Sequence, residues 1–377
     1  MVGGNVTRRL RLVAFAVAAA LAVPTVAGAR AVLVRAGAKR VLIVYLDSVL
    51  RQPVIAPDRG PLAFSGDGEL ISIGGDITSR GVALPADSLT WSPTGERAAA
   101  VTAKGGVATW TQAGKRWIVR DGWGADAVAW SRHGALAIGR RNTLWIWRRG
   151  TLQRLIGPLR GDVQPLPAAW TADGRMLWWA YPDSASIAAD GVALYEGGHR
   201  IGFGLMYPDY VAVCGAHVAF AAGRDRYAMH GKRIVFDGRD LSRDPSRSWV
   251  SPSCNAAGRL VAAASANLVP RTIGREHRSI WQLLPTRRRL TQPPAGWTDE
   301  DPHVLADGSV VFVRTRWTSS KVDGTWRSTQ RGDVELLANG KLKTLAHVGF
   351  TEPSLVTEYP LDYYGHYDWT HFVAVTG

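Results

Sequence analysis

The sequence of 377 residues is poor in cysteine and in charge, and it holds none of the short linear patterns of common catalytic sites. Charged residues make up 20% and hydrophobic residues 46% of the chain, which excludes a charge-rich disordered protein. No G-x-S-x-G, H-E-x-x-H, P-loop, C-x-x-C or EF-hand pattern occurs. Two cysteines without a nearby pair of histidines make a poor zinc site. The sequence therefore predicts no metal and no cofactor, and it favours a protein that is not an enzyme.

Acidic residues are outnumbered by basic ones, 31 to 45, which gives a formal net charge of +14. Such a charge fits nucleic acid, an anionic membrane or an acidic cell-wall polymer as a partner, although an arginine-rich proteome raises the charge of every protein that it encodes. The densest basic cluster is Arg287-Arg288-Arg289, and no nucleic-acid-binding motif accompanies it. We therefore do not expect nucleic acid to be the partner.

The apolar stretch near the amino terminus is too short for a permanent membrane span. Arg8, Arg9 and Arg11 precede this stretch, which runs from Leu12 to Val23. Ala27-Gly28-Ala29 then fits the A-x-A cleavage pattern. We expect residues 1–29 to be a signal peptide that is cleaved after Ala29, and the protein to be exported to the periplasm, the cell envelope or the medium. Three arginines and no acidic residue leave with this segment, so the mature chain would carry a net charge of +11.

Tryptophan and glycine are abundant, with 16 and 41 residues, and many of them belong to an internal repeat. An aromatic or apolar residue, a polar turn and a glycine are followed by an apolar run, as in Trp91-Ser92-Pro93-Thr94-Gly95 and Trp130-Ser131-Arg132-His133-Gly134. Further copies begin at 64, 170, 254 and 304, with a degraded copy near 213. Such turns join two antiparallel strands, because glycine accepts a positive φ. The spacings of 27, 39, 40, 43, 41 and 50 residues are typical of β-propeller blades.

Several short motifs follow one another in a distinctive order between residues 280 and 308. Ile280-Trp281-Gln282-Leu283 leads to Arg289-Leu290-Thr291, then to Asp301-Pro302-His303, and then to the turn Ala306-Asp307-Gly308. This order resembles the repeat of the carboxy-terminal β-propeller of TolB, in which a strand ends in L-T, a D-x-x-P segment follows and W-S-P-D-G opens the next blade. The resemblance covers roughly residues 60–345. Nothing resembles the separate amino-terminal domain of TolB, so the resemblance does not imply a TolB-like role in the Tol–Pal envelope system.

We predict an all-β fold, a single β-propeller domain over residues 30–377. It would have about seven four-stranded blades, with six or eight as the alternatives. Two strands are predicted at one end, Val41–Leu46 and Val49–Ile55, and two at the other, Glu352–Val356 and His371–Val375. Propellers commonly complete one blade from both termini, which hides the edges of the sheets. We therefore expect the terminal strands to share one blade.

The two cysteines leave two alternatives open. An exported protein meets an oxidising environment, in which Cys214 and Cys254 can form a disulfide. In the repeat alignment Cys254 takes the register of Trp91, Trp130 and Trp170, whereas Cys214 falls next to that register. Successive side chains of a strand point to opposite faces, so a disulfide and two buried thiols remain equal alternatives. The tryptophans of this register are expected to pack between blades.

Two clusters of polar side chains are candidates for a functional site. The first lies near the carboxy terminus among aromatic residues and consists of Tyr364, His366, Asp368 and His371. It suits a sugar or metal site or, on a structural interpretation, a loop that caps the closing blade. The second precedes the turn at 304 and consists of Asp299, Glu300, Asp301 and His303. It suits a cation site at the channel mouth or, again, a turn of the repeat. We favour the structural interpretation of both clusters.

We expect an exported, non-enzymatic propeller that binds a protein or an anionic cell-envelope polymer at the loops around one channel mouth. A structural domain of an envelope complex is one alternative. The other is a propeller-type hydrolase or lyase whose channel-lining acids come from Asp126, Asp162, Asp209 and Asp301. Carboxylates that converge about 5–10 Å apart in the channel would favour the enzyme. A channel filled by apolar side chains would favour binding.

Overall fold

The computed structural model describes residues 30–37, 40–48, 50–55, 62–64, 71–73, 76–77, 82–83, 89–92, 97–101, 106–111, 116–119, 124–131, 133–182, 191–268, 276–322, 325–349 and 365–376. In these ranges the chain forms antiparallel strands and one short 3-10 helix, η1 (Pro208–Tyr210). The predicted signal peptide, the predicted strand at 352–356 and Tyr364 lie outside the described residues. Within the described ranges, no helix has the length and apolar character needed to cross a membrane.

Most sheets are meanders in which four consecutive strands pair in chain order. The first consists of β4 (Leu62–Phe64), β5 (Ile71–Ile73), β6 (Asp76–Ile77) and β7 (Val82–Ala83). The second consists of β8 (Leu89–Trp91), β9 (Arg97–Val101), β10 (Val107–Thr111) and β11 (Arg116–Ile118). The third consists of β12 (Ala125–Trp130), β13 (Leu136–Arg140), β14 (Thr143–Arg148) and β15 (Thr151–Ile156).

One sheet has eight strands, because two meanders meet at the single residue pair Gly204 and Ala222. The first meander consists of β16 (Val163–Trp170), β17 (Met176–Pro182), β18 (Val192–Glu196) and β19 (His199–Gly204). The second consists of β20 (Val211–Cys214), β21 (His217–Ala222), β22 (Arg233–Phe236) and β23 (Arg239–Asp240).

Two further four-stranded sheets follow along the chain. One consists of β24 (Arg247–Cys254), β25 (Leu260–Ala266), β26 (Ser279–Leu284) and β27 (Arg288–Arg289). The other consists of β28 (Thr298–Val304), β29 (Val310–Val322), β30 (Thr325–Ala338) and β31 (Lys341–Val348). Strands β29 and β30 remain paired as far as Val322 and Thr325, so they extend past their neighbours as a two-stranded arm.

The remaining sheet joins the two ends of the described chain. In spatial order it consists of β3 (Arg51–Ile55), β2 (Arg40–Tyr45), β1 (Ala31–Gly37) and β32 (Val373–Thr376). Strand β32 runs antiparallel to β1, with Val32 opposite Val375 and Val34 opposite Val373. Strands β2, β3 and β32 correspond to strands predicted from the sequence, whereas β1 is not among the predicted ones.

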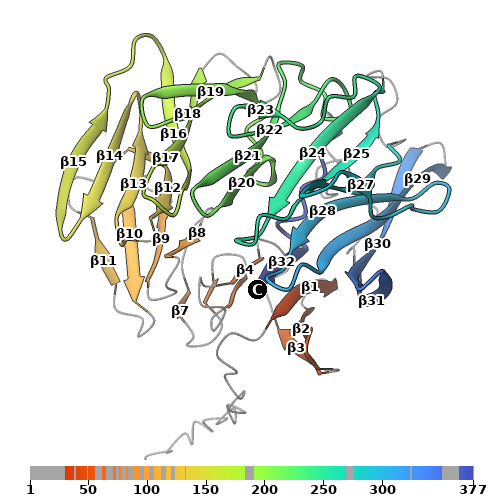
Figure 1. The fold of residues 1–377 in the computed structure, drawn as a ribbon. Helices are drawn as coiled ribbons and strands as arrows, with labels where there is room; N and C mark the ends of the chain where they lie inside the picture. The colour runs from red at the N-terminus through yellow and green to blue at the C-terminus, as the bar shows by residue number, and fades with distance from the viewer. Residues whose placement is uncertain are drawn as a thin grey trace, which may run out of the picture.

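The all-β prediction is confirmed by six four-stranded sheets and the eight-stranded one. Figure 1 shows these sheets following one another in chain order around a common centre. Each half of the eight-stranded sheet has the strand pattern of a four-stranded one, so the described residues hold eight groups of four strands. This is one more than the number that the sequence favours, and the blade count of the whole chain stays a prediction.

The first strands of successive sheets, from β8 to β28, lie against one another and are called inner strands below. The turns that follow them share one construction. The side chains of Ser131, Thr171 and Asn255 each accept the backbone N–H of the residue four positions later, at 2.9, 2.8 and 3.1 Å. The glycine that precedes this donor has a positive φ of 74°, 89° or 80°, at Gly134, Gly174 and Gly258. The repeated polar residue and glycine are therefore both required by the turn.

Cys214 and Cys254 form a disulfide, with Cα atoms 5.6 Å apart. Each cysteine is the last residue of its inner strand, β20 or β24. The turn after Cys214 is short, since Cys214 pairs directly with His217, whereas Cys254 pairs with Leu260. The repeat alignment places Cys214 next to the register of Cys254, while alignment by the strand ends places the two cysteines side by side.

We predict that Asn255→Ala destabilises the fold more than Ser131→Ala does. Asn255 caps its own turn and also donates from Nδ2 to the Leu305 carbonyl of the next sheet, at 2.9 Å. Ser131 makes the turn bond. Because a buried hydrogen bond contributes about 1 kcal/mol, the expected losses are about 2 and about 1 kcal/mol. Urea titration of the free energy of unfolding measures both, and equal losses would contradict the role given to the bond between sheets.

Candidate functional site

Two inner strands carry a polar residue in a strained backbone conformation. Ser251 and Asp301 have φ values of 49° and 48°, and the register of β24 and of β28 shifts at these positions. A proline follows each of them in the sequence, Pro252 and Pro302. Positive φ outside glycine is uncommon, and bulges of this kind often re-aim a side chain at a functional site.

Asp209, in η1 before β20, is the centre of a hydrogen-bond network on these inner strands. Its Oδ2 accepts the Ser251 hydroxyl at 2.7 Å, and its Oδ1 lies 2.8 Å from Nε2 of His366. The Tyr207 ring stacks on the His366 ring, with centroids 3.6 Å apart, and Tyr210 meets it edge-on. The His366 side chain is only 4% exposed, so the network fixes this carboxy-terminal histidine 157 residues away from its aspartate.

The order of these groups is not that of a hydrolytic triad. In a triad the histidine lies between serine and carboxylate and removes the serine proton. Here the carboxylate of Asp209 lies between Ser251 and His366. The Ser251 hydroxyl donates a hydrogen bond to the carboxylate of Asp209, and no histidine is placed to remove its proton in this network. The network therefore positions side chains and does not form a serine-hydrolase site.

A second carboxylate–histidine pair lies on β28, where Nε2 of His303 is 3.0 Å from Oδ2 of Asp301. Burial works against the charged form of His303, but the charge of Asp301, its hydrogen bond to the ring and the charge of Asp209 together outweigh it. The pKa of His303 therefore lies above its ordinary value. Asp209 and Asp301 therefore both favour the charged form of His303.

A buried arginine holds the carboxy-terminal segment against this region. Arg278 is 1% exposed, and its Nη1 donates to Glu300 at 2.9 Å while its Nη2 donates to the Gly365 carbonyl at 3.0 Å. Its guanidinium also lies over the Tyr367 ring, and the Tyr367 hydroxyl lies 3.4 Å from Glu276. Burial raises the pKa of Glu300 to about 7, although Arg278 and the Thr298 hydroxyl act in the opposite direction. The buried ion pair of Arg278 and Glu300 is thus tied to the carboxy-terminal segment, a structural arrangement that is costly to break.

The structure separates several residues that the sequence grouped together. Asp299 is fully buried in a bidentate ion pair with Arg314, at 2.7 and 2.9 Å. Asp368 is exposed and caps the turn at Thr370. His371 is exposed as well, and its backbone carbonyl accepts from Arg35 at 2.8 Å. Of the predicted site residues in the described ranges, His366 lies in the network of Asp209 and Asp301 pairs with His303, whereas Asp299, Asp368 and His371 take part in neither.

The other acids proposed for a channel site are also dispersed. Asp126 is exposed and accepts the backbone N–H of Arg141 at 2.9 Å, and Asp162 is exposed. In the described ranges, no three side chains among His, Cys, Asp and Glu are arranged to hold a metal ion. A cavity of ≈ 790 Å³ at the ends of the inner strands is lined mainly by apolar groups and the disulfide, including Trp130, Trp170, Val213, Cys214, Cys254 and Val304.

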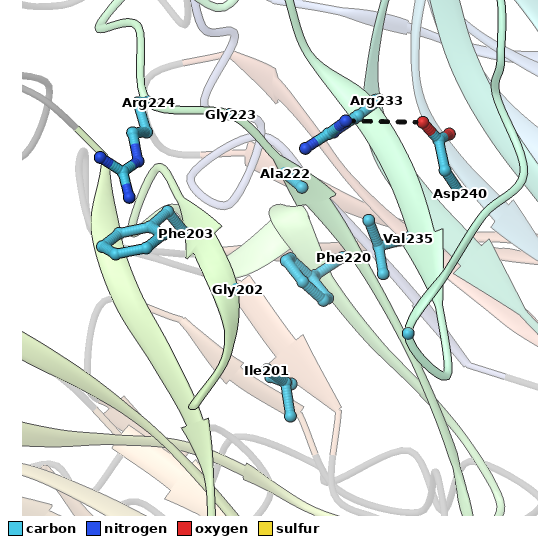
Figure 2. Close-up of a pocket in the computed structure, with 11 residues that line it drawn as sticks. Ile201, Gly202, Phe203, Phe220, Ala222, Gly223, Arg224, Arg233, Val235 and Asp240 are labelled. Carbon is cyan, nitrogen blue, oxygen red and sulfur yellow. Dashed lines mark ion pairs between the residues drawn. The ribbon is translucent and has the colours of Figure 1, made fainter. Parts of the chain in front are cut away.

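Arginines gather instead in clefts between neighbouring groups of four strands. The cleft between β19 and β22, of ≈ 410 Å³, is shown in Figure 2. Phe220 and Val235 form apolar walls, and the guanidinium of Arg224 lies 4.1 Å from the centroid of the Phe203 ring. Arg233, on the opposite side, is 3.7 Å from Asp240. Cation–π stacking thus fixes Arg224 beside an apolar surface.

Three further clefts have the same character. One of ≈ 380 Å³ is lined by Arg259, Arg288 and Arg289, two of which belong to the basic cluster seen in the sequence. One of ≈ 400 Å³ is lined by Lys232, Arg233, Arg243 and Arg247. A larger one of ≈ 610 Å³, called the β15 groove below, is lined among others by His133, Arg148, Arg149, Gln153, Arg154 and Trp170. The sequence shows these arginines but not the clefts, because each cleft also takes lining residues from other strands and turns.

Comparison with known proteins gives the fold and no more. No protein-family model and no curated protein matches the chain. The solved structure of the dihydro-heme d1 dehydrogenase NirN in complex with DHE is similar, with a TM-score of 0.54, 13% identity, and coverage of 85% of this chain and 73% of that chain. The GH74 xyloglucanase from Xanthomonas campestris has a TM-score of 0.39, 13% identity, and coverage of 68% and 45%. The sheets described above and the likeness to NirN define a β-propeller protein.

We predict that Asp301→Asn destabilises the protein more at pH 5.5 than at pH 8.5. The raised pKa of His303 means that its pairing stabilises the fold fully below the ordinary histidine pKa of 6.5. That contribution fades as the pH rises through the raised value. We expect a loss of about 1 kcal/mol at pH 5.5 and a smaller one at pH 8.5, both from urea titrations. Asparagine keeps the shape and tolerates the positive φ.

Asp333→Asn is the matched control, because Asp333 pairs with the exposed His347 at 2.6 Å. Exposed pairs contribute little, so its effect should stay below about 0.5 kcal/mol at both pH values. An equal loss for Asp301→Asn at pH 5.5 and 8.5 would contradict the electrostatic role given to the Asp301–His303 pair.

Proposed function

We propose that this chain is an exported, non-enzymatic β-propeller that binds an anionic component of the cell envelope. The observation that carries the proposal is the placement of arginine. Four clefts between neighbouring groups of four strands are each lined by at least two arginines. Arginine is the side chain that best matches carboxylate and phosphate groups, because its planar fork donates two parallel hydrogen bonds. An anionic ligand that contacts several clefts would gain affinity from each.

The inner-strand network supports binding over hydrolysis. Asp209 already has both oxygens engaged, by Ser251 and by His366. The cavity at the inner-strand ends is mainly apolar. Such a lining suits an interaction protein better than a glycosidase, because a glycosidase needs two facing carboxylates. We therefore place the functional surface at the clefts and not on the axis.

The proposal also includes export after cleavage of a signal peptide and a propeller repeat of the TolB type. Strand β1 begins at Ala31, so cleavage after Ala29 would leave every described strand intact. The motif order near residue 300 supports a repeat of the TolB type, with Asp301-Pro302 at the bulge of β28. Amino-terminal sequencing of protein exported from cells tests this step, with Arg30 expected as the first residue.

We predict that the chain from Arg30 binds acidic polymers and that the affinity falls steeply with salt. The probes are polygalacturonate, polyphosphate and the neutral glucan pullulan, with affinity measured by fluorescence titration at low salt and at about 0.5 M salt, where the Debye length is only a few ångströms. We expect binding to at least one acidic polymer, at least tenfold weaker at high salt, and no binding to pullulan. Absence of binding to both acidic polymers, or binding that is insensitive to salt, would contradict the proposal.

A further inference from the structure

The β15 groove differs from the other arginine-lined clefts in its charge balance. Its lining includes Arg148, Arg149, Arg154 and His133 and no carboxylate. The other three clefts each contain at least one aspartate, such as Asp240 or Asp307. Within the described residues no ion pair engages Arg148, Arg149 or Arg154, and all three are exposed. Their positive charge is therefore available to an external anion.

The hairpin of β14 and β15 holds these arginines in place. Arg148 pairs across the turn with Thr151, and the two turn residues, Arg149 and Gly150, both have positive φ, of 50° and 83°. Two such residues form the tight hairpin turn whose twist matches the strands. Arginine is unusual at such a position, where asparagine or glycine is preferred. The chain thus accepts a strained turn that keeps an arginine at the tip of the hairpin.

The groove lies between two sheets. One wall comes from β14 and β15, and the other comes from Trp170 and Gly174 at the next turn. Trp170 is half-buried, and its Nε1 donates to the Ala129 carbonyl at 3.1 Å, which fixes the indole. Leu155, 46% exposed, and Gln153 also line the groove. The lining of the groove therefore combines apolar faces, an amide and guanidinium groups.

We propose that the β15 groove binds an acidic polysaccharide through the carboxylates of its uronate-type sugars. This inference rests on the function proposed above and names the site and the ligand class. Arg148 and Arg154 would pair with carboxylates, Gln153 would bond hydroxyl groups, and Trp170 and Leu155 would pack against the apolar faces of the sugar rings. A volume of ≈ 610 Å³ lies within the range of ligand sites. A polyphosphate chain would leave the indole and the leucine without a matching surface.

The test is the double variant Arg148→Gln/Arg154→Gln, with Arg226→Gln/Arg331→Gln as the control. The control removes the same charge from exposed arginines that line none of the described clefts. The probes are polygalacturonate and polyphosphate of similar length, titrated at one low salt concentration. Circular dichroism and the midpoint of thermal unfolding check that both variants fold like the parent chain.

We expect the groove variant to bind polygalacturonate at least about tenfold more weakly, since two charge-assisted hydrogen bonds are lost, and the control to change by less than about threefold. The parent chain should prefer polygalacturonate to polyphosphate. Equal losses in both variants, or no loss in either, would overturn the groove as the site while leaving the anion-binding function standing. A preference for polyphosphate would overturn the sugar assignment. No binding of either polymer by the parent chain would overturn the proposed function itself.

Discussion

Every sheet of this protein depends on its neighbours to cover its two faces. Trp178 and Trp179 are adjacent in β17 and therefore point to opposite faces, yet both are buried, at 3% and 4% exposure. A single sheet cannot bury both side chains, so the arrangement is stable only when sheets follow one another around a centre. The sheet that joins the two ends of the chain meets its neighbours in the same way, since β1 contacts β31 and β32 contacts β4. Arg278 fixes the segment that leads to β32, through the Gly365 carbonyl.

This arrangement also determines where polar groups lie. On the inner strands there is room for a small network in which Asp209, Ser251 and His366 engage one another. Farther out, the clefts between sheets expose apolar side chains such as Ile201 and Phe203 beside arginines. Arginine suits such places, because its stem can cover apolar surface while its charged head stays in water. The clefts are therefore basic and partly apolar, which is the chemistry that an acidic sugar polymer requires.

The repeat could be predicted from the sequence because the interactions in each copy join residues that are only a few positions apart. A polar residue that caps a turn and a glycine with positive φ, as at Thr171 and Gly174, leave a pattern within a few positions. Contacts between sheets leave no such pattern, because they join residues that are far apart in the sequence. Nothing in the sequence connects His366 with Asp209 or Arg278 with Gly365, which are 157 and 87 residues apart. Nor does the sequence show that Trp178 and Trp179 are both buried, because this depends on the neighbours that cover the two faces of their sheet. The β15 groove could not be foreseen either, since Trp170 and Arg148 come from different sheets.

The most direct test of the account is to map where an acidic polysaccharide protects the protein from hydrogen exchange. Exchange would be followed by mass spectrometry on the chain from Arg30, with and without saturating polygalacturonate. The account predicts protection in peptides that cover the β14–β15 hairpin, residues 143–156, and the turn after Trp170. It predicts no change in peptides that contain Asp209, Ser251 or His366. Protection centred on those three residues, with the hairpin unchanged, would contradict the account and place the ligand on the axis.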